Sequence, residues 1–438
     1  MYWLNSSVGL IGADQSTLTR RHPDPGILRL RPRNLPKLVT HMTVDRRMRV
    51  DGEPASIEPA EFLDVTLPQL FAEATDRLGP SLREMQPRPL TLTVDGRSWT
   101  LRADDARVAV TRGPGTGSAI RVDAEQLDAL VADKVTPMGW LASGSLDMTG
   151  HLSDVLNWWL LVRATLDGTT PHRTGAIEFE DRAGGPLDLS RSFTPADPAA
   201  DMAWFLEQAG FLHIKGLYSE DEMAAVSAEM DVAATRYADG DGRSWWAGLK
   251  DGSRALVRMQ RFHKESPLAA ELVADERLTR IASLTGDGHV AGGWDGNRLE
   301  ALYKPIGVVQ GISDIPWHKD CSLGRHSYDC CGLTVGISVT GADAMSGQLR
   351  VVAGSHRALV WPAPSLQPGL DLPVVDLATE TGDVTVHCSC TLHMAAPPVQ
   401  RERRVMYTSF SLPSLGGADA DRKELRRMAD AAPLNTSQ

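Results

Sequence analysis

A histidine and a carboxylate lie two residues apart in the sequence IPWHKDCSLG, residues 315–324. Alternate residues of a β-strand point to the same face, so His318 and Asp320 can reach one cavity if this segment is extended. Two imidazoles and one carboxylate on one face of a metal ion, with open positions opposite, are the ligands of non-haem Fe(II) oxygenases. The H-x-D pattern also occurs by chance on solvent-facing strands, so this interpretation needs a third ligand.

The segment DVTVHCSCTLH, residues 383–393, supplies two candidates for that ligand. As a single strand it has apolar even positions and polar odd positions, which predicts one core face and one cavity face. His387 and His393 share the polar face but are too far apart on one strand to hold the same ion. We assign His393, because it is nearest the following turn, and expect His387 to support the site or lie in the core.

Two arginines begin the strand that returns after this turn. A guanidinium group binds a carboxylate through two parallel hydrogen bonds, which suits a dicarboxylate co-substrate beside the metal. Arg404 lies eleven residues after His393, and Arg403 is its neighbour. Because adjacent strand residues point in opposite directions, only one of the two can face the site. We expect it to be Arg404, with Arg403 as the alternative.

Short β-like runs separated by Gly, Pro and Asp surround these residues from about residue 299 onward, a pattern typical of a sandwich or jelly roll. Residues 198–238 before them read helix, strand, helix, and SEDE at 219–222 is a good helix cap. In the first half, residues 89–113 alternate and contain Asp-Gly, which predicts a hairpin. Residues 154–168 are apolar nearly all round, which predicts a helix that is buried or lines an apolar cavity.

Composition divides the chain into successive segments and predicts an α+β protein of two domains. A Gly- and Pro-rich stretch marks the linker, and a polar stretch marks the end. The segments are an N-terminal extension (1–60), a first domain (61–168), a linker (169–195), a second domain (196–413) and a polar tail (414–438).

Charge and cysteine content restrict the classes of function. The net charge of −11 argues against nonspecific binding to nucleic acid. We expect no membrane span, no secretory signal and a cytoplasmic location. Five cysteines suggest free thiols in a reducing compartment, and their spacing disfavours a zinc site. These cysteines are Cys321, Cys330, Cys331, Cys388 and Cys390.

The second half resembles the phytanoyl-CoA dioxygenase family of Fe(II)/2-oxoglutarate enzymes, with matching motifs in family order over roughly residues 195–413. The motifs are FLHIKGLYSEDEMAAV, LYKP, WHKD, GISVTGADAMSGQLRVVAGSHR, GDVTVHCSCTLHMAAPP and RERRV. The resemblance implies a double-stranded β-helix of the jelly-roll or cupin-like type with flanking helices. It also implies that Fe(II), 2-oxoglutarate and O2 are used.

Carried over by motif, the resemblance makes His318, Asp320 and His393 the catalytic iron ligands and Arg404 the partner of the distal carboxylate of 2-oxoglutarate. It suggests that Lys304 of LYKP touches the co-substrate. Many members have Asn and Ser after the distal histidine, where this chain has MAAPPVQ. Thr334 or Thr408 are the expected replacements for the missing hydroxyl.

Residues 61–168 resemble a sterol-carrier-protein lipid-transfer domain, an α/β sandwich around an apolar tunnel. The resemblance rests on TLTVDGRSWTLR and on the GSLDMTG strand before the long apolar helix. It implies an apolar ligand for this domain. The alternative is a scaffold that packs on the second domain or mediates dimerisation.

Together these patterns predict an oxygenase that hydroxylates, or otherwise oxidises, an unactivated C–H bond of a partly apolar small molecule of secondary metabolism. Asp320 favours hydroxylation, or a desaturation or ring-forming variant, over halogenation, since related halogenases have a small residue there. The other hypothesis is a non-catalytic lipid- or sterol-binding carrier with a vestigial jelly roll. Candidate substrate contacts are Trp245, Trp246, Arg258 and Trp317.

Overall fold

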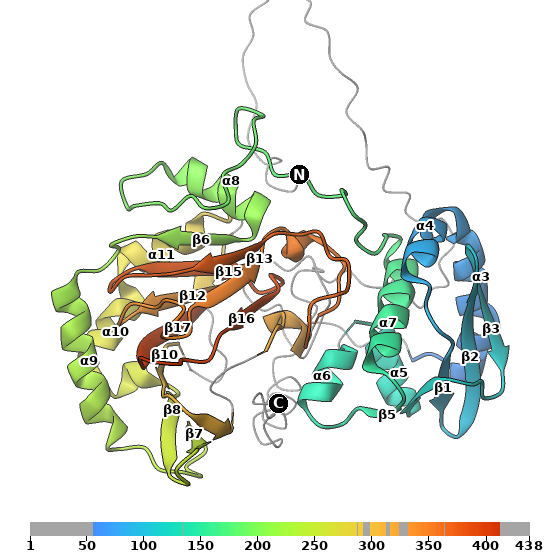
Figure 1. Cartoon of the computed structure of the whole chain (residues 1–438), viewed down its shortest axis with the longest axis horizontal. Coiled ribbons are helices and arrows are strands. Elements are labelled where there is room, and N and C mark those ends of the chain that lie inside the picture. The colour runs from blue at the N-terminus through green and yellow to red at the C-terminus, as the bar shows by residue number, and fades with distance from the viewer. Residues whose placement is uncertain are drawn as a thin grey trace, which may run out of the picture.

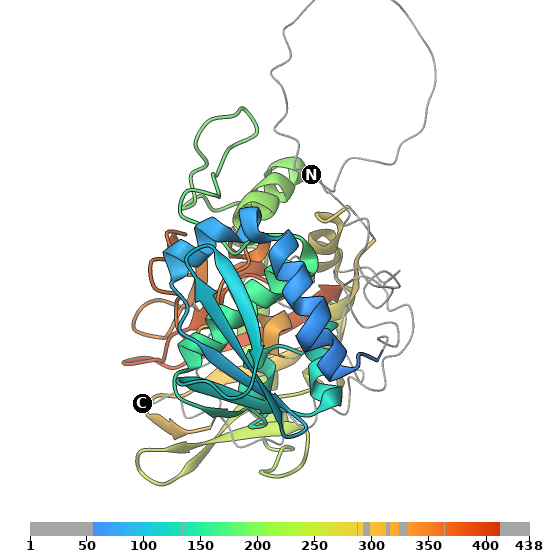
Figure 2. The same cartoon turned by 90° about the vertical axis from the view of Figure 1, so that its right-hand side faces the viewer.

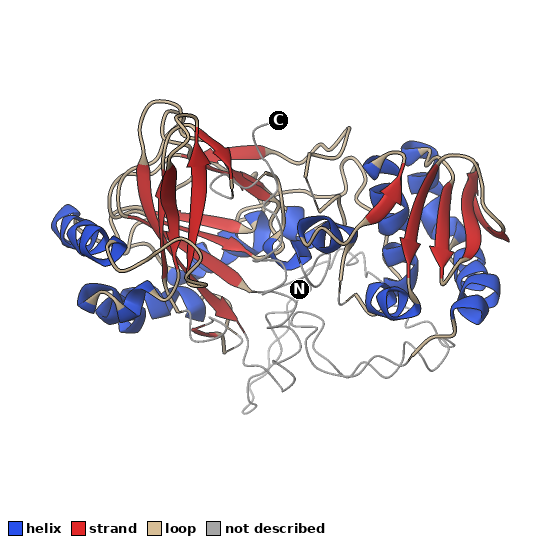
Figure 3. Cartoon of the chain, turned by 90° about the horizontal axis from the view of Figure 1, so that it is seen from below, coloured by secondary structure: helices blue, strands red, loops and turns tan. Residues whose placement is uncertain are grey.

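The chain forms two units that lie side by side (Figures 1 and 3). The computed structural model describes residues 56–133, 135–286, 288–291, 298–311, 316–323, 332–362 and 364–411. Most of the predicted extension 1–60, the whole predicted tail 414–438, and Cys330 and Cys331 lie outside these residues. Among the described residues, no helix is both long and apolar enough to cross a bilayer.

The N-terminal unit is a five-stranded sheet in the order β3-β2-β1-β4-β5, with helices packed on it (Figure 2). Its strands are β1 (Leu90–Val94), β2 (Arg97–Asp104), β3 (Arg107–Arg112), β4 (Ser118–Val122) and β5 (Asp147–Thr149). Its helical elements are α2 (Pro59–Glu61), the π-helical turn η1 (Phe62–Thr66), α3 (Leu67–Glu73), α4 (Thr75–Met85), α5 (Ala124–Val131), α6 (Pro137–Ala142) and α7 (Leu152–Asp167).

Two local predictions for this unit are confirmed. β1 and β2 form an antiparallel hairpin, and Asp95 and Gly96 at its turn have φ of 46° and 78°, as a tight hairpin turn requires. The segment that is apolar nearly all round forms α7, most of whose side chains are buried, including Trp158 and Trp159. Its apolar surface is used in packing against β1, β4 and neighbouring helices.

The C-terminal unit is mixed α/β with large antiparallel sheets, consistent with the predicted jelly-roll-like fold. A nine-stranded sheet has the order β11-β7-β8-β10-β17-β12-β15-β6, with β9 paired to β17. A three-stranded sheet has the order β14-β13-β16. Helices α9, α10 and α11 cover one face of the large sheet, and the small sheet lies on the side away from them (Figure 1).

The elements of this unit begin and end as follows. The strands are β6 (Phe211–Ile214), β7 (Ser244–Leu249), β8 (Arg254–Met259), β9 (Val290–Ala291), β10 (Glu300–Lys304), β11 (Val308–Gln310), β12 (Leu333–Ser338), β13 (Leu349–Val352), β14 (Val374–Leu377), β15 (Val384–Cys388), β16 (His393–Ala395) and β17 (Arg403–Ser411). The helical elements are α8 (Ala199–Ala209), α9 (Glu220–Ala234), η2 (Phe262–Lys264), α10 (Pro267–Ala274), α11 (Glu276–Ser283), η4 (Asp320–Leu323) and η5 (Ser355–Arg357).

The start of α9 shows why the chain folds as its sequence predicts. Ser219 caps the backbone N–H of Glu222, and the Glu222 carboxylate accepts from the backbone N–H of Ser219. This reciprocal capping box satisfies two donors that the first turn of a helix leaves unpaired. The predicted helix cap at 219–222 is confirmed.

The single strand predicted over 383–393 is wrong. β15 ends at Cys388, and the chain then turns, with the backbone N–H of Thr391 donating to Cys388 O at 2.7 Å. His393 begins β16, which belongs to the small sheet. The polar and apolar alternation continues through the turn, so the sequence pattern did not reveal the break.

The two units share one hydrophobic cluster. Leu359 and Trp361 of the C-terminal unit pack among buried residues of the N-terminal unit, and the Trp361 indole N–H donates to Asn157 Oδ1 at 2.9 Å. Helix α6 lies against η4, the turn that begins with Asp320 (Figure 1). The N-terminal unit therefore supports the segment that carries a predicted metal ligand.

Candidate active site

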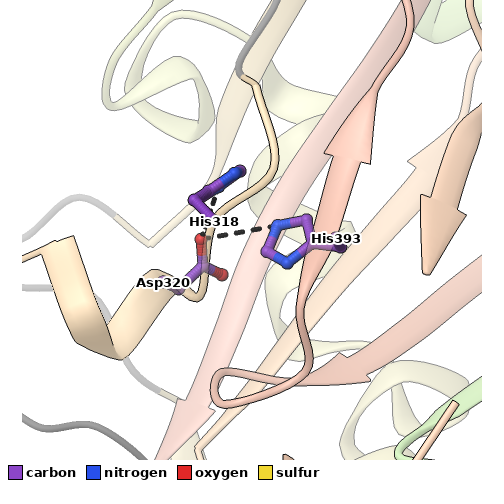
Figure 4. A group of neighbouring side chains, drawn as sticks. All are labelled: His318, Asp320 and His393. Atoms are coloured by element: carbon purple, nitrogen blue, oxygen red, sulfur yellow. Dashed lines mark ion pairs between the residues drawn. The ribbon is translucent and has the colours of Figure 1, made fainter. Parts of the chain in front are cut away.

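His318, Asp320 and His393 come together at the contact between the two sheets. One ligand-type atom from each lies within 4.8 Å of the others (Figure 4). Asp320 Oδ1 is 3.3 Å from His318 Nε2 and 3.6 Å from His393 Nε2. The main chains of the two histidines pair directly, since each N–H donates to the other's carbonyl at 2.9 Å. This bridge, and not a shared strand, fixes the spacing of the two imidazoles.

Backbone carbonyls orient both imidazole rings. His318 Nδ1 is 2.7 Å from Pro316 O, and His393 Nδ1 is 2.9 Å from Thr391 O. A carbonyl oxygen can only accept, so each Nδ1 carries the proton, and each Nε2 presents its lone pair towards Asp320. This is the tautomer and orientation that a metal-binding histidine requires.

The ionisation of the group suits a cation. Burial lowers the pKa of His393 well below its usual value, and the neighbouring histidines add to the effect. Burial by itself would raise the pKa of Asp320, but the positive charge that the adjacent imidazoles carry when protonated outweighs it and holds that pKa well below its usual value. A neutral imidazole and an ionised carboxylate are the forms that bind metal. Two nitrogens and one oxygen on one side of a shared space fit Fe(II).

Thr334 contributes to this site in a way that the sequence did not predict. Its hydroxyl donates to Asp320 Oδ2 at 2.7 Å, so it orients the carboxylate and leaves Oδ1 towards the histidines. The sequence predicts a different contact for Thr334, with the co-substrate. Thr408, the other expected hydroxyl, donates instead to Arg298 O at 2.7 Å.

His387 lies closer to the site than a continuous strand would allow. Its ring centroid is 4.1 Å from that of His393, and its Nε2 is 3.5 Å from Asp320 Oδ2. The side chain is buried, and within the described part of the chain neither ring nitrogen has a hydrogen-bond partner. The expectation that His387 and His393 are far apart is wrong, because the turn after β15 brings His393 back over it.

Arg404 does not face the metal group. Its guanidinium is 2.8 Å from Asp231 Oδ1, donates to Ser227 on the same helix, α9, and lies 5.1 Å from the centre of the Tyr303 ring. These contacts place it on the helix-covered face of the large sheet. The expected orientation is therefore wrong, because counting residues through a Pro-containing turn does not determine the strand register.

Arg403 takes the opposite face by strand alternation. It pairs in register with Lys304 of β10, whereas Arg404 pairs with Tyr303. Arg403 is buried, and among the described residues its Nε has no hydrogen-bond partner. Lys304 is also buried and donates to Ala396 O at 3.1 Å, three residues beyond His393. This face therefore brings two cations to the chain segment that follows His393.

Of the four expected substrate contacts, three lie together. A register shift pairs Trp245 with Arg258 and Trp246 with Leu256, two residues of β8 that share a face. The Arg258 guanidinium is 4.2 Å from the Trp245 ring centre and 3.1 Å from Glu300 Oε2. Glu300, which the sequence pattern does not single out, begins β10, the strand that also carries Leu302, Tyr303 and Lys304 of LYKP.

Trp317 lies elsewhere, although it precedes His318 in the chain. It packs against a separate small cluster that includes Val352 and Leu392, with the Arg350 guanidinium 5.8 Å from its ring centre. These contacts are those of a side chain that supports the small sheet.

Comparison with known proteins covers mainly the C-terminal unit. Residues 206–405 match the family model described as Phytanoyl-CoA dioxygenase (PhyH). The similarity to this family is thus confined to the C-terminal unit. Ectoine dioxygenase of Stutzerimonas stutzeri is 27% identical over 184 residues, which are 40% of this chain and 56% of the relative. The Bordetella parapertussis enzyme is 28% identical over 173 residues, 37% of this chain and 51% of the relative. The chain thus spans about half the length of these curated relatives.

Solved structures with detectable similarity include EctD from S. alaskensis with bound Fe. It is 20% identical, has a TM-score of 0.40, and covers 53% of this chain and 83% of that chain. The non-heme alpha ketoglutarate dependent carbocyclase SnoK from nogalamycin biosynthesis is 17% identical with a TM-score of 0.40, over 55% of this chain and 94% of that chain.

Proposed function

We propose that this protein is an Fe(II)/2-oxoglutarate-dependent oxygenase that oxidises a C–H bond of a small molecule. The single observation that carries the proposal is the arrangement of His318, Asp320 and His393. Both Nε2 atoms and one carboxylate oxygen converge, and hydrogen bonds fix both imidazole tautomers. The family match of residues 206–405 supports the same chemistry. We assign the metal-binding role to these three residues.

We propose Arg403, in place of Arg404, as the residue that binds the distal carboxylate of 2-oxoglutarate. A buried guanidinium nitrogen without a partner among the described residues is costly unless an anion pairs with it. Lys304, its register partner, adds a second positive charge on that face. In contrast, Arg404 is already paired with Asp231.

Bound iron and 2-oxoglutarate would together supply the oxidising chemistry that activates O2. The residues of the chain would bind the metal and the co-substrate and orient them. His318, Asp320 and His393 would hold the metal, and Thr334 orients the Asp320 carboxylate through its hydrogen bond to Oδ2. Arg403 and Lys304 would position the co-substrate by its charge.

For the substrate we propose a partly apolar small molecule that reaches the face formed by Trp245, Arg258 and Glu300. An indole surface beside an Arg–Glu ion pair offers an apolar contact together with donors and acceptors. For the N-terminal unit we propose a scaffold role. The support is its packing around Leu359 and Trp361 and the contact of α6 with the Asp320 turn.

The test measures succinate formed from 2-oxoglutarate by the Fe(II)-loaded protein in air. Arg403→Ala should raise the half-saturating 2-oxoglutarate concentration by about 30-fold or more, since unpairing a buried charge costs roughly 2–5 kcal/mol. Arg404→Ala is the matched control and should leave this concentration within about threefold of the parent. The reverse pattern would contradict the assignment. Absence of succinate from the parent, with and without added candidate substrates, would contradict the oxygenase proposal.

A further inference from the structure

Two buried cysteines lie beside the candidate metal group without taking part in it. Cys321 directly follows Asp320, and Cys390 lies three residues before His393. Their Sγ atoms are 2.8 Å apart, and no disulfide joins them in the structure. A disulfide needs about 2.05 Å between its sulfur atoms. A relative movement of roughly 1 Å would therefore bring these two atoms to bonding distance.

The approach of the two sulfurs is supported by the main chain and does not depend on side-chain rotation alone. The backbone N–H of Cys321 donates to Ser389 O at 3.2 Å, next to Cys390. The Cys390 turn is held in place because the Thr391 hydroxyl donates to Gly210 O at 2.7 Å. Both cysteines therefore occupy turns that are already hydrogen-bonded to each other or to the sheet.

We propose that Cys321 and Cys390 form a reversible disulfide that fastens the Asp320 turn to the turn preceding His393. In the forward step each thiol loses a proton, the pair loses two electrons, and the S–S bond forms. Hydrogen peroxide accepts the two protons and two electrons, its O–O bond breaks, and two water molecules result. A dithiol reductant reverses the crosslink by thiol–disulfide exchange and is itself oxidised to a disulfide.

The position of the crosslink suggests its consequence. The cysteines are 69 residues apart in the chain, and the segments they join carry two of the three ligands in the proposed function. Closing so long a loop restricts the unfolded chain and raises the midpoint of thermal unfolding. It also limits separation of Asp320 from His393, so Fe(II) should dissociate more slowly. This last effect rests on the proposed function, whereas formation of the disulfide does not.

Peptide mapping of the metal-free full chain tests the crosslink directly. Trypsin cleaves after Lys319 and Arg325, which places Cys321 alone in the peptide 320–325. After treatment with one to two equivalents of hydrogen peroxide, we expect this peptide to be linked to peptide 358–401 and to be released by dithiothreitol. A Cys321 that stays alkylatable, becomes a sulfinic acid, or links to Cys330 or Cys331 would overturn the proposal.

Variants assign the second sulfur, because peptide 358–401 contains both Cys388 and Cys390. Cys388→Ser is the matched control, since Cys388 is also buried but lies at the end of β15. It should crosslink as the parent does, whereas Cys390→Ser should not. Crosslinking that survives in Cys390→Ser and is lost in Cys388→Ser would overturn the pairing. Mapping of the parent needs neither variant to fold.

Iron retention is measured after the peroxide has been removed. Fe(II) transfer to a chelator should be at least about threefold slower from the oxidised parent than from the reduced parent. Equal rates with the crosslink present would overturn the tethering effect. A protein that crosslinks but binds no Fe(II) in either form would overturn the proposed function and leave the disulfide supported.

Discussion

Asp320 owes its orientation to the Thr334 hydroxyl, which lies on the neighbouring strand β12. A carboxylate that follows an irregular turn has several rotamers available, and a hydrogen bond to one oxygen selects the rotamer that directs the other towards the histidines. The same logic applies to His318 and His393, whose Nδ1 atoms are held by backbone carbonyls. Backbone carbonyls and one side-chain hydroxyl thus set the orientation of these three side chains.

Replacing Thr334 by Val should weaken Fe(II) binding by about tenfold, because it removes the hydrogen bond to Asp320 and keeps the shape of the side chain. Thr408→Val is the matched control. It also loses a threonine hydroxyl that donates a hydrogen bond, but one that bonds to Arg298 O and not to Asp320. Competition with a chelator of known affinity measures the Fe(II) affinity of both variants. Equal weakening in the two variants would show that the effect is one of general stability.

The grouping of the three proposed ligands could be predicted from residue types and spacing, whereas the contacts that orient them could not. His318, Asp320 and His393 were selected from the sequence, and the fold brings them within reach of one ion. The number of residues in the turn after His393 favours Arg404 over Arg403 as the residue that faces the site. Arg404 instead lies on the helix-covered face of the large sheet, paired with Asp231. Thr334 was named for a different contact, since a side-chain hydrogen bond between distant segments leaves no periodic signal.

At the scale of elements, α9 is attached to its neighbours by an ion-pair cluster at its first turn. Arg277 donates to Glu222 Oε1 at 2.7 Å and to Asp275 Oδ2 at 2.6 Å. The hydrogen bond from Arg277 and the capping contacts of Ser219 lower the pKa of Glu222 to about 2. Because α9 also carries the partners of Arg404, this cluster supports the outer face of the sheet behind the site.

A pH dependence follows from the lowered pKa of Glu222. A carboxyl with a lower pKa in the folded state contributes stability above its unfolded value, near 4.5, and loses it as the pH falls towards 2. The free energy of unfolding of the parent should exceed that of Glu222→Gln by about 1 kcal/mol at pH 7, because the pair is partly exposed. Urea unfolding at pH 7 and pH 3 measures this difference. It should shrink at pH 3, and a constant difference would contradict the assignment.

The elements themselves were predicted unevenly. Local signals such as the Asp-Gly turn and the cap at Ser219 were predicted correctly, because a few adjacent residues determine them. The break between β15 and β16 was missed, because tertiary pairing decides it: β15 pairs with β12 and β6, and β16 with β13. That break brings His387 and His393 together.

At the scale of the whole molecule, the two units share buried surface next to the Asp320 turn. Trp361 is buried in the N-terminal cluster, and its indole N–H is bonded to Asn157. Trp361→Ala should lower the free energy of unfolding by about 3–5 kcal/mol. Trp361→Phe keeps most of the packing and should cost about 1 kcal/mol for the lost hydrogen bond. Chemical denaturation measures the free energy of unfolding of both variants. A negligible decrease in Trp361→Ala would argue against a core shared by the two units.

The most direct test of the proposed activity uses the visible spectrum. Adding Fe(II) and 2-oxoglutarate to the protein without oxygen should produce a weak charge-transfer band, because the co-substrate would bind the metal held by His318, Asp320 and His393. The band should be absent in His393→Ala and should need far more 2-oxoglutarate in Arg403→Ala. A parent protein that binds Fe(II) and 2-oxoglutarate but shows no band, or a band that persists in His393→Ala, would contradict the proposed site.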